Sequence, residues 1–131
     1  MKGEIILIYY EINLRIEELY DELKTIYVGS GIVCIKDGTI EGYIARDYIS
    51  GSISKNRLYL STLDVDFRDG YELITEGACD ITLPGQYILY GYNDGVYAIA
   101  EITFEEKLPE DKIVDTAEKL KEIKELALKW I

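Results

Sequence analysis

The stretch EIILIYYEINLRIEELYDELKTIY, residues 4–27, decides the fold because its apolar residues fit more than one secondary structure. Residues 4–12 are β-branched and aromatic, which is typical of a buried strand, and Asn13 is a favourable helix N-cap. After Asn13 the apolar residues follow a helical spacing, namely Ile16, Leu19, Tyr20, Leu23 and Ile26. We therefore expect a strand over 4–12 and then a helix, which Gly29 and Gly31 end.

A single helix over residues 4–27 is the alternative. The residues Ile5, Ile8, Tyr9 and Ile12 extend the same helical spacing backward. The sequence leaves these two interpretations open.

The middle of the chain favours strands. Residues 32–35 and 40–45 flank Asp37-Gly38, a pair that suits a type I′ hairpin turn. Between Arg57 and Phe67 the apolar residues change phase, since Leu58 and Leu60 are followed by Leu63, Val65 and Phe67. This pattern predicts a strand with a bulge near Ser61 and Thr62, and with Leu63 pointing inward.

A second hairpin is predicted over residues 86–104, with Asp94-Gly95 as its turn. In this register Tyr92 pairs with Tyr97, Tyr90 with Ile99 and Ile88 with Glu101, and the three tyrosines share one face. Pro109 then suits the first turn of a closing helix, whose apolar stripe packs on the sheet through Ile113, Ala117, Leu120, Ile123, Ala127 and Trp130.

These elements predict a single α+β domain over residues 1–131. We expect a mostly antiparallel sheet or small open barrel of about six strands, with an N-terminal helix after the first strand and a C-terminal helix packed on the sheet. The longest apolar run is far shorter than the ~20 residues of a membrane span, which favours a soluble, cytoplasmic protein. The low content of Asn, Gln and Met favours a thermophilic source.

Charge and composition exclude several chemistries. The chain carries 14 basic and 25 acidic residues, a formal net charge of −11, and it has no histidine. The usual general base, imidazole metal ligand and catalytic triads are therefore absent. Cys34 and Cys79 lack the spacing of a redox or zinc motif, and either two free thiols or one disulfide fits them. We expect no cofactor, no metal site and no catalytic residue.

The acidic stretch over residues 63–80 is open to three interpretations. Asp64, Asp66, Asp69 and Glu72 lie between apolar residues. They fit the solvated face of a strand, a docking surface for a basic protein, or a metal loop, although Arg68 and Asp69 occupy positions where a calcium loop needs a ligand and a glycine. These four acids are our candidate partner-binding residues.

Tyr90, Tyr92 and Tyr97 are the candidate ligand-binding residues, because clustered tyrosines can stack on bases or planar ligands. They can equally bury their rings under the C-terminal helix. The stretches 83–90, LPGQYILY, and 94–102, DGVYAIAEI, resemble the paired strands of PUA and ASCH domains. That resemblance implies a small barrel that binds RNA or a nucleoside-like ligand.

The net charge makes nucleic acid an unlikely partner, since binding it depends on basic residues that neutralise phosphates. The sequence therefore favours a small acidic, non-catalytic interaction module that contacts a basic protein. A PUA- or ASCH-like binder of RNA or a small ligand is the alternative, an enzyme that uses carboxylates or tyrosine is a third interpretation, and the oligomeric state is undetermined.

Overall fold

The computed structural model describes residues 8–64, 72–78, 85–93 and 95–130. Within these residues, eight antiparallel strands close a barrel in which each strand pairs with the next one in sequence and β8 returns to pair with β1. The strands are β1 (Ile8–Tyr20), β2 (Leu23–Lys36), β3 (Thr39–Ile44), β4 (Asp47–Ser54), β5 (Arg57–Asp64), β6 (Glu72–Ala78), β7 (Gly85–Asn93) and β8 (Val96–Lys107). Helix α1 (Ile113–Ala127) follows, between the short 3-10 helices η1 (Glu110–Lys112) and η2 (Leu128–Trp130).

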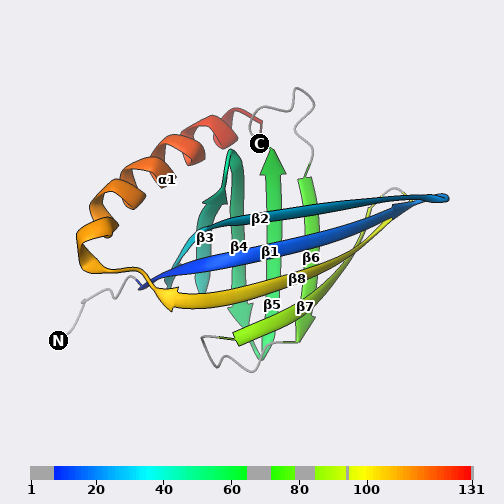
Figure 1. Ribbon diagram of the computed structural model, residues 1–131, viewed down its shortest axis with the longest axis horizontal. Helices are drawn as coiled ribbons and strands as arrows, with labels where there is room; N and C mark the ends of the chain where they lie inside the picture. Colours follow the sequence, from blue (N-terminus) through cyan, green and yellow to red (C-terminus); the bar gives the residue numbers. More distant parts are fainter. Residues whose placement is uncertain (1–7, 65–71, 79–84, 94, 131) are drawn as a thin grey trace.

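The barrel is flattened into two layers whose strands cross at a steep angle (Figure 1). One layer contains β7, β8, β1 and β2, and the other contains β3 to β6. The β1–β2 hairpin projects beyond the second layer, while α1 lies at the opposite end and contacts β3 and β4. The fold therefore has a helix-covered end and a projecting end.

The space between the layers is filled by side chains that alternate along each strand. Phe104 is central, because the rings of Tyr10 and Tyr87 approach it edge-on with centroids 6.2 and 6.0 Å away. The buried residues of this core are Tyr10, Ile12, Leu14, Ile16, Val33, Ile40, Ile44, Ile49, Leu58, Leu60, Tyr87, Leu89, Ala98, Ala100, Ile102 and Phe104. Burial of each larger side chain stabilises the fold by roughly 1.5–3 kcal/mol.

A second buried cluster lies outside the barrel, under α1. It contains Tyr9, Cys34, Tyr43, Tyr48, Leu63, Leu108, Leu120, Ile123 and Ala127. The predicted bulge in β5 is wrong, since the pairing of β5 with both neighbours continues without a register shift from Arg57 to Leu63. The apolar phase changes because Leu58 and Leu60 point into the barrel whereas Leu63 points out, toward the cluster under the helix.

The predicted N-terminal helix is also wrong, both as a helix after Asn13 and as a single helix over 4–27. Among the described residues of that stretch, 8–20 form β1 and 23–27 begin β2, joined by a turn in which Asp21 has a φ of 55°. The alternation of Ile12, Leu14 and Ile16 gives β1 its buried face, and β1 pairs with β8 as far as Tyr20. This long-range pairing overrides the helical spacing.

Gly31 is required by the close approach of two strands and does not end a helix. A Cβ atom at this position would lie 2.0 Å from the backbone oxygen of Tyr43 on β3. Since such an overlap forces the backbones apart, only glycine fits where β2 begins to pair with β3. The expected open sheet of about six strands is accordingly replaced by a closed barrel of eight.

The predicted Asp37-Gly38 turn, the register of the second hairpin and the closing helix are confirmed, while Asp94 lies outside the described residues. Lys36 pairs with Thr39, and Asp37 and Gly38 have φ values of 51° and 81°. In the second hairpin Tyr92 pairs with Tyr97, Tyr90 with Ile99 and Ile88 with Glu101. Helix α1 buries Leu120, Ile123 and Ala127 of the predicted stripe against the outside of the barrel. No helix among the described residues has the length and apolarity of a membrane span.

Two leucine substitutions test this arrangement against the helical alternative. Leu14 is 2% exposed in the barrel core, whereas Leu23, on the expected helical stripe, is 69% exposed. Leu14→Ala is expected to lower the free energy of unfolding by about 2–5 kcal/mol, and Leu23→Ala by less than about 0.5 kcal/mol. Urea denaturation of dilute protein measures both values. Equal losses from the two variants would contradict the strand assignment.

Candidate binding surface

The projecting end of the barrel is a four-stranded sheet in the order β2, β1, β8, β7. Its strand pairings align side chains in rows across the sheet. On the outer face, one row runs Lys24, Leu19, Tyr97 and Tyr92, the next Ile26, Glu17, Ile99 and Tyr90, and the next Val28, Arg15, Glu101 and Ile88. Apolar and charged side chains therefore alternate across this face.

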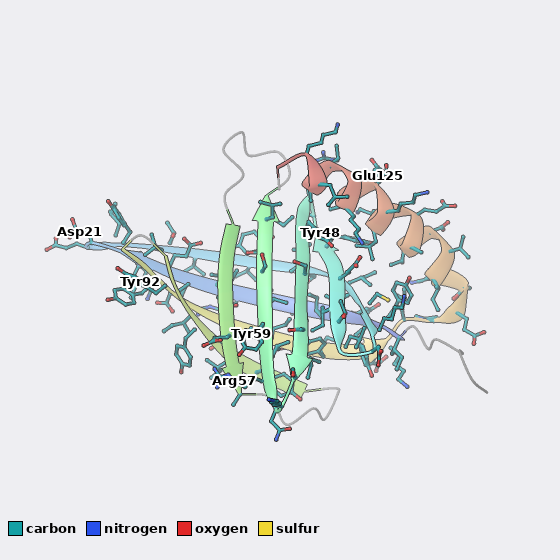
Figure 2. The ribbon with its side chains drawn as sticks, turned by 180° about the vertical axis from the view of Figure 1, so that it is seen from behind. Asp21, Tyr48, Arg57, Tyr59, Tyr92 and Glu125 are labelled. Carbon is teal, nitrogen blue, oxygen red and sulfur yellow. The ribbon has the colours of Figure 1, made fainter. Side chains whose placement is uncertain are left out.

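Six apolar side chains gather on the β7–β8 side of these rows, and we call them the aromatic patch. They are Leu19, Ile88, Tyr90, Tyr92, Tyr97 and Ile99. Tyr90, Tyr92 and Tyr97 are 60%, 61% and 61% exposed, and the ring centroids of Tyr92 and Tyr97 lie 4.8 Å apart. Figure 2 shows Tyr92 directed away from the barrel, on the same projecting end as Asp21. The expectation that these rings pack under the helix is therefore wrong.

A chain of ion pairs separates the aromatic patch from β2. Glu17 forms one ion pair with Lys24 of β2 and another, at 3.4 Å, with Arg15 of its own strand. The hydrogen bond from Lys24 is the main cause that lowers the pKa of the Glu17 carboxyl. Ile26 and Val28 lie on the β2 side of these ion pairs and the aromatic patch lies on the β8 side, so the outer face carries two apolar surfaces.

Carboxylates border the aromatic patch on its other sides. Glu76 of β6 pairs in register with Tyr90 and forms an ion pair of 3.4 Å with Arg57. Glu101 lies between Ile88 and Arg15 in its row, and it forms no ion pair with any described residue. Beyond Glu101, Asn13 donates a hydrogen bond of 2.7 Å to Glu105. The border of the patch is thus negative and partly uncompensated.

The predicted partner-binding acids are only partly placed. Asp64 ends β5 and Glu72 begins β6, where Glu72 pairs in register with Leu63. Asp66 and Asp69 lie outside the described residues. The structure therefore brings the three candidate tyrosines together, and of the four acids it places only the strand positions of Asp64 and Glu72.

The helix-covered end has a different character. An open hollow of about 500 Å³ lies between α1 and the β3–β4 turn, lined by Ala45, Arg46, Asp115, Glu118, Lys119, Glu122 and Ile123. Next to it Lys124 donates a hydrogen bond of 2.9 Å to Glu41, and this bond raises the pKa of Lys124. This pair links α1 to β3. Because both side chains are half-exposed, the pair adds little to stability.

The buried polar groups near the helix include three tyrosines, a thiol and Thr116 of α1. Burial raises the pKa values of Tyr43 and Tyr48. Cys34 is a free thiol that forms a hydrogen bond with Tyr9. Burial raises the pKa values of both Cys34 and Tyr9. Among the described residues there is no cluster of three or more acidic or cysteine side chains that would hold a metal ion.

The three tyrosines follow from the sequence pattern, whereas their apolar neighbours on the patch do not. The helical spacing predicts a buried face for Leu19, and the exposure of Ile88 and Ile99 follows only from the pairing of β8 with β1. The alternation of Ile12, Leu14 and Ile16 was the one signal that could have placed Leu19 on the opposite, outer face.

The sequence matches no protein-family model, and a comparison with curated proteins found no significant match.

The reactivity of Cys34 tests the cluster under the helix. Because its pKa is raised and its side chain is buried, little thiolate is present near neutral pH and reagents reach it poorly. In a Cys79→Ser variant, native Cys34 is expected to react with Ellman's reagent at least roughly a hundredfold more slowly than the same thiol in denaturant. Fast reaction in the native protein would contradict this packing of α1.

Proposed function

We propose that this protein is a non-catalytic interaction module that binds a basic segment of a partner protein through the aromatic patch. The observation that supports this proposal is the set of exposed apolar and tyrosine side chains on one face of the projecting sheet, bordered by carboxylates. The partner expected from this chemistry carries arginine or lysine side chains between apolar ones.

The apolar character of the patch supports binding to a protein. Six large apolar side chains of three neighbouring strands share it, and contiguous exposed apolar surfaces of this kind commonly mark interaction sites. Tyrosine is enriched among the residues that dominate binding energy, because it offers a wide and rigid surface with a polar tip. Tyr92 and Tyr97, whose rings are adjacent, are the expected centre of the contact.

The charge of the patch supports a basic partner. The net charge of −11 attracts cations over the whole molecule, and Glu101 offers a carboxylate that no described residue pairs. A guanidinium or ammonium group can also lie over a tyrosine ring. The chain makes this contact internally, where Nζ of Lys119 lies 4.9 Å from the centroid of the Tyr43 ring.

The alternative of an RNA or nucleoside-like ligand is supported by the same tyrosines, since exposed rings can stack on bases. The charge of the protein disfavours it, because the net charge of −11 and the carboxylate of Glu101, which no described residue pairs, repel a phosphate. A short oligouridine therefore serves as the competing probe in the test below.

A peptide-binding experiment tests the proposal. The probe is a fluorescent peptide in which arginine alternates with leucine, and its matched control replaces every arginine with glutamate. We expect the arginine peptide to bind, and Tyr92→Ala to weaken this binding about tenfold or more because a central aromatic contact is lost. Fluorescence anisotropy measures the dissociation constants, and binding should weaken as salt is raised.

Tyr20→Ala is the control variant. Tyr20 is 56% exposed on the same projecting end, but the strand alternation places it on the inner face of the sheet. It should leave the affinity unchanged. Equal losses from Tyr20→Ala and Tyr92→Ala, or tighter binding of the oligouridine than of the arginine peptide, would refute the proposal.

A further inference from the structure

The projecting part of β2 has one free edge. β2 pairs with β1 over its whole length, but it pairs with β3 only from Gly31 to Lys36. Over Leu23–Ser30 the opposite edge has no strand partner among the described residues, and Figure 1 shows this part of the hairpin extending past β3. None of the described strands therefore occupies that edge, which is the geometry that strand addition requires.

This edge lacks the features that usually prevent pairing. It contains no proline, and its single charged side chain, Lys24, is held by Glu17 across the hairpin. Leu23, Ile26 and Val28 are large apolar residues that are more than half exposed. Native proteins commonly protect exposed edges with charges, prolines or bulges, so an unprotected edge indicates a strand partner.

The charge distribution identifies the kind of strand that fits. The chain has 25 acidic residues, yet none of them lies in β2, Leu23–Lys36. A basic strand would find no carboxylate along this edge, whereas an uncharged strand meets no repulsion. The free part of β2 carries one charged side chain, Lys24, and Glu17 already neutralises it, so a second copy of β2 meets little repulsion there.

We propose that two copies of this protein associate through the β2 edges, Leu23–Ser30 against Leu23–Ser30, in an antiparallel arrangement with a two-fold axis at Ile26. Ile26 lies near the centre of the free edge, so an axis there pairs almost the whole of Leu23–Ser30. It places Ile26 beside Ile26 of the second copy, and Lys24 opposite Val28 of the second copy. No like charges face one another along the contact.

The acids at the hairpin turn do not oppose this contact. Glu22 would lie opposite Ser30 of the second copy, so the two Glu22 side chains are separated by the length of chain between positions 22 and 30, roughly 27 Å at about 3.4 Å per residue. The Debye length is about 8 Å at physiological ionic strength, and the repulsion between them is therefore screened. Because a two-fold contact uses the same edge of both copies, the assembly closes as a dimer.

Sedimentation velocity over a wide range of protein concentration tests the proposal. We expect the unmodified protein to form dimers, and Ile26→Lys to raise the dimer dissociation constant by at least about tenfold because two added cations meet at the axis. Tyr92→Lys is the matched control, since Tyr92 is similarly exposed but lies on β7, and it should dimerise normally. A monomeric unmodified protein, or a dimer that Ile26→Lys leaves intact, would overturn the proposal.

A crosslinking measurement covers the case in which Ile26→Lys fails to fold. In the Cys79→Ser background, Ile26→Cys is expected to give a covalent dimer with a short bis-maleimide, because the two Cβ atoms at the axis lie about 5 Å apart. Tyr92→Cys should remain monomeric under the same treatment. Monomer alone from Ile26→Cys would exclude this contact. Neither measurement involves the arginine peptide, so their outcome is independent of the proposed function.

Discussion

The pairing of β8 with β1 is the constraint on which the rest of the structure depends. It runs from Tyr20 against Val96 to Tyr10 against Lys107, and it joins the two ends of the strand sequence into a barrel. The register shifts between Tyr10 and Ile12, where Tyr9 points under α1 while Tyr10 points into the barrel core. One irregularity thus connects barrel closure with the docking of the helix, and Leu108 continues the connection by donating its backbone N–H to Tyr9 at 2.9 Å.

This dependence explains which parts of the fold the sequence predicts. The Asp37-Gly38 turn and the register of β7 with β8 depend on residues close in sequence, so local patterns are sufficient for them. The closing helix also forms from a local apolar stripe. By contrast, β1 is fixed by β8, about eighty residues away, and the helical spacing of Ile16, Leu19 and Tyr20 is incidental once that partner is in place. Leu63 shows the same effect, since its orientation depends on a helix that follows much later in the chain.

The candidate surface was predictable to the same limited extent. The shared face of Tyr90, Tyr92 and Tyr97 follows from the register of a single hairpin. Their exposure does not, because it depends on α1 covering the other end of the barrel and leaving the projecting sheet uncovered. The apolar residues that were expected to bury a helix, among them Leu19, Leu23 and Ile26, are instead the exposed ones. An apolar period in a sequence therefore identifies residues that need a partner, and it leaves open whether the partner belongs to the same chain.

The two proposed contacts are compatible because the ion pairs of Glu17 with Lys24 and Arg15 lie between them. Antiparallel pairing of the β2 edges requires a two-fold axis perpendicular to the sheet, and such an axis keeps both outer faces on the same side. β8 of one copy and β8 of the other are then separated by β1 and β2 of each copy, roughly 24 Å at about 4.8 Å between strands. Both aromatic patches would face a partner together, and a partner with two suitably spaced basic segments would gain affinity from binding both at once. The dimer would in this way turn a weak, screened attraction for basic peptides into a selective one.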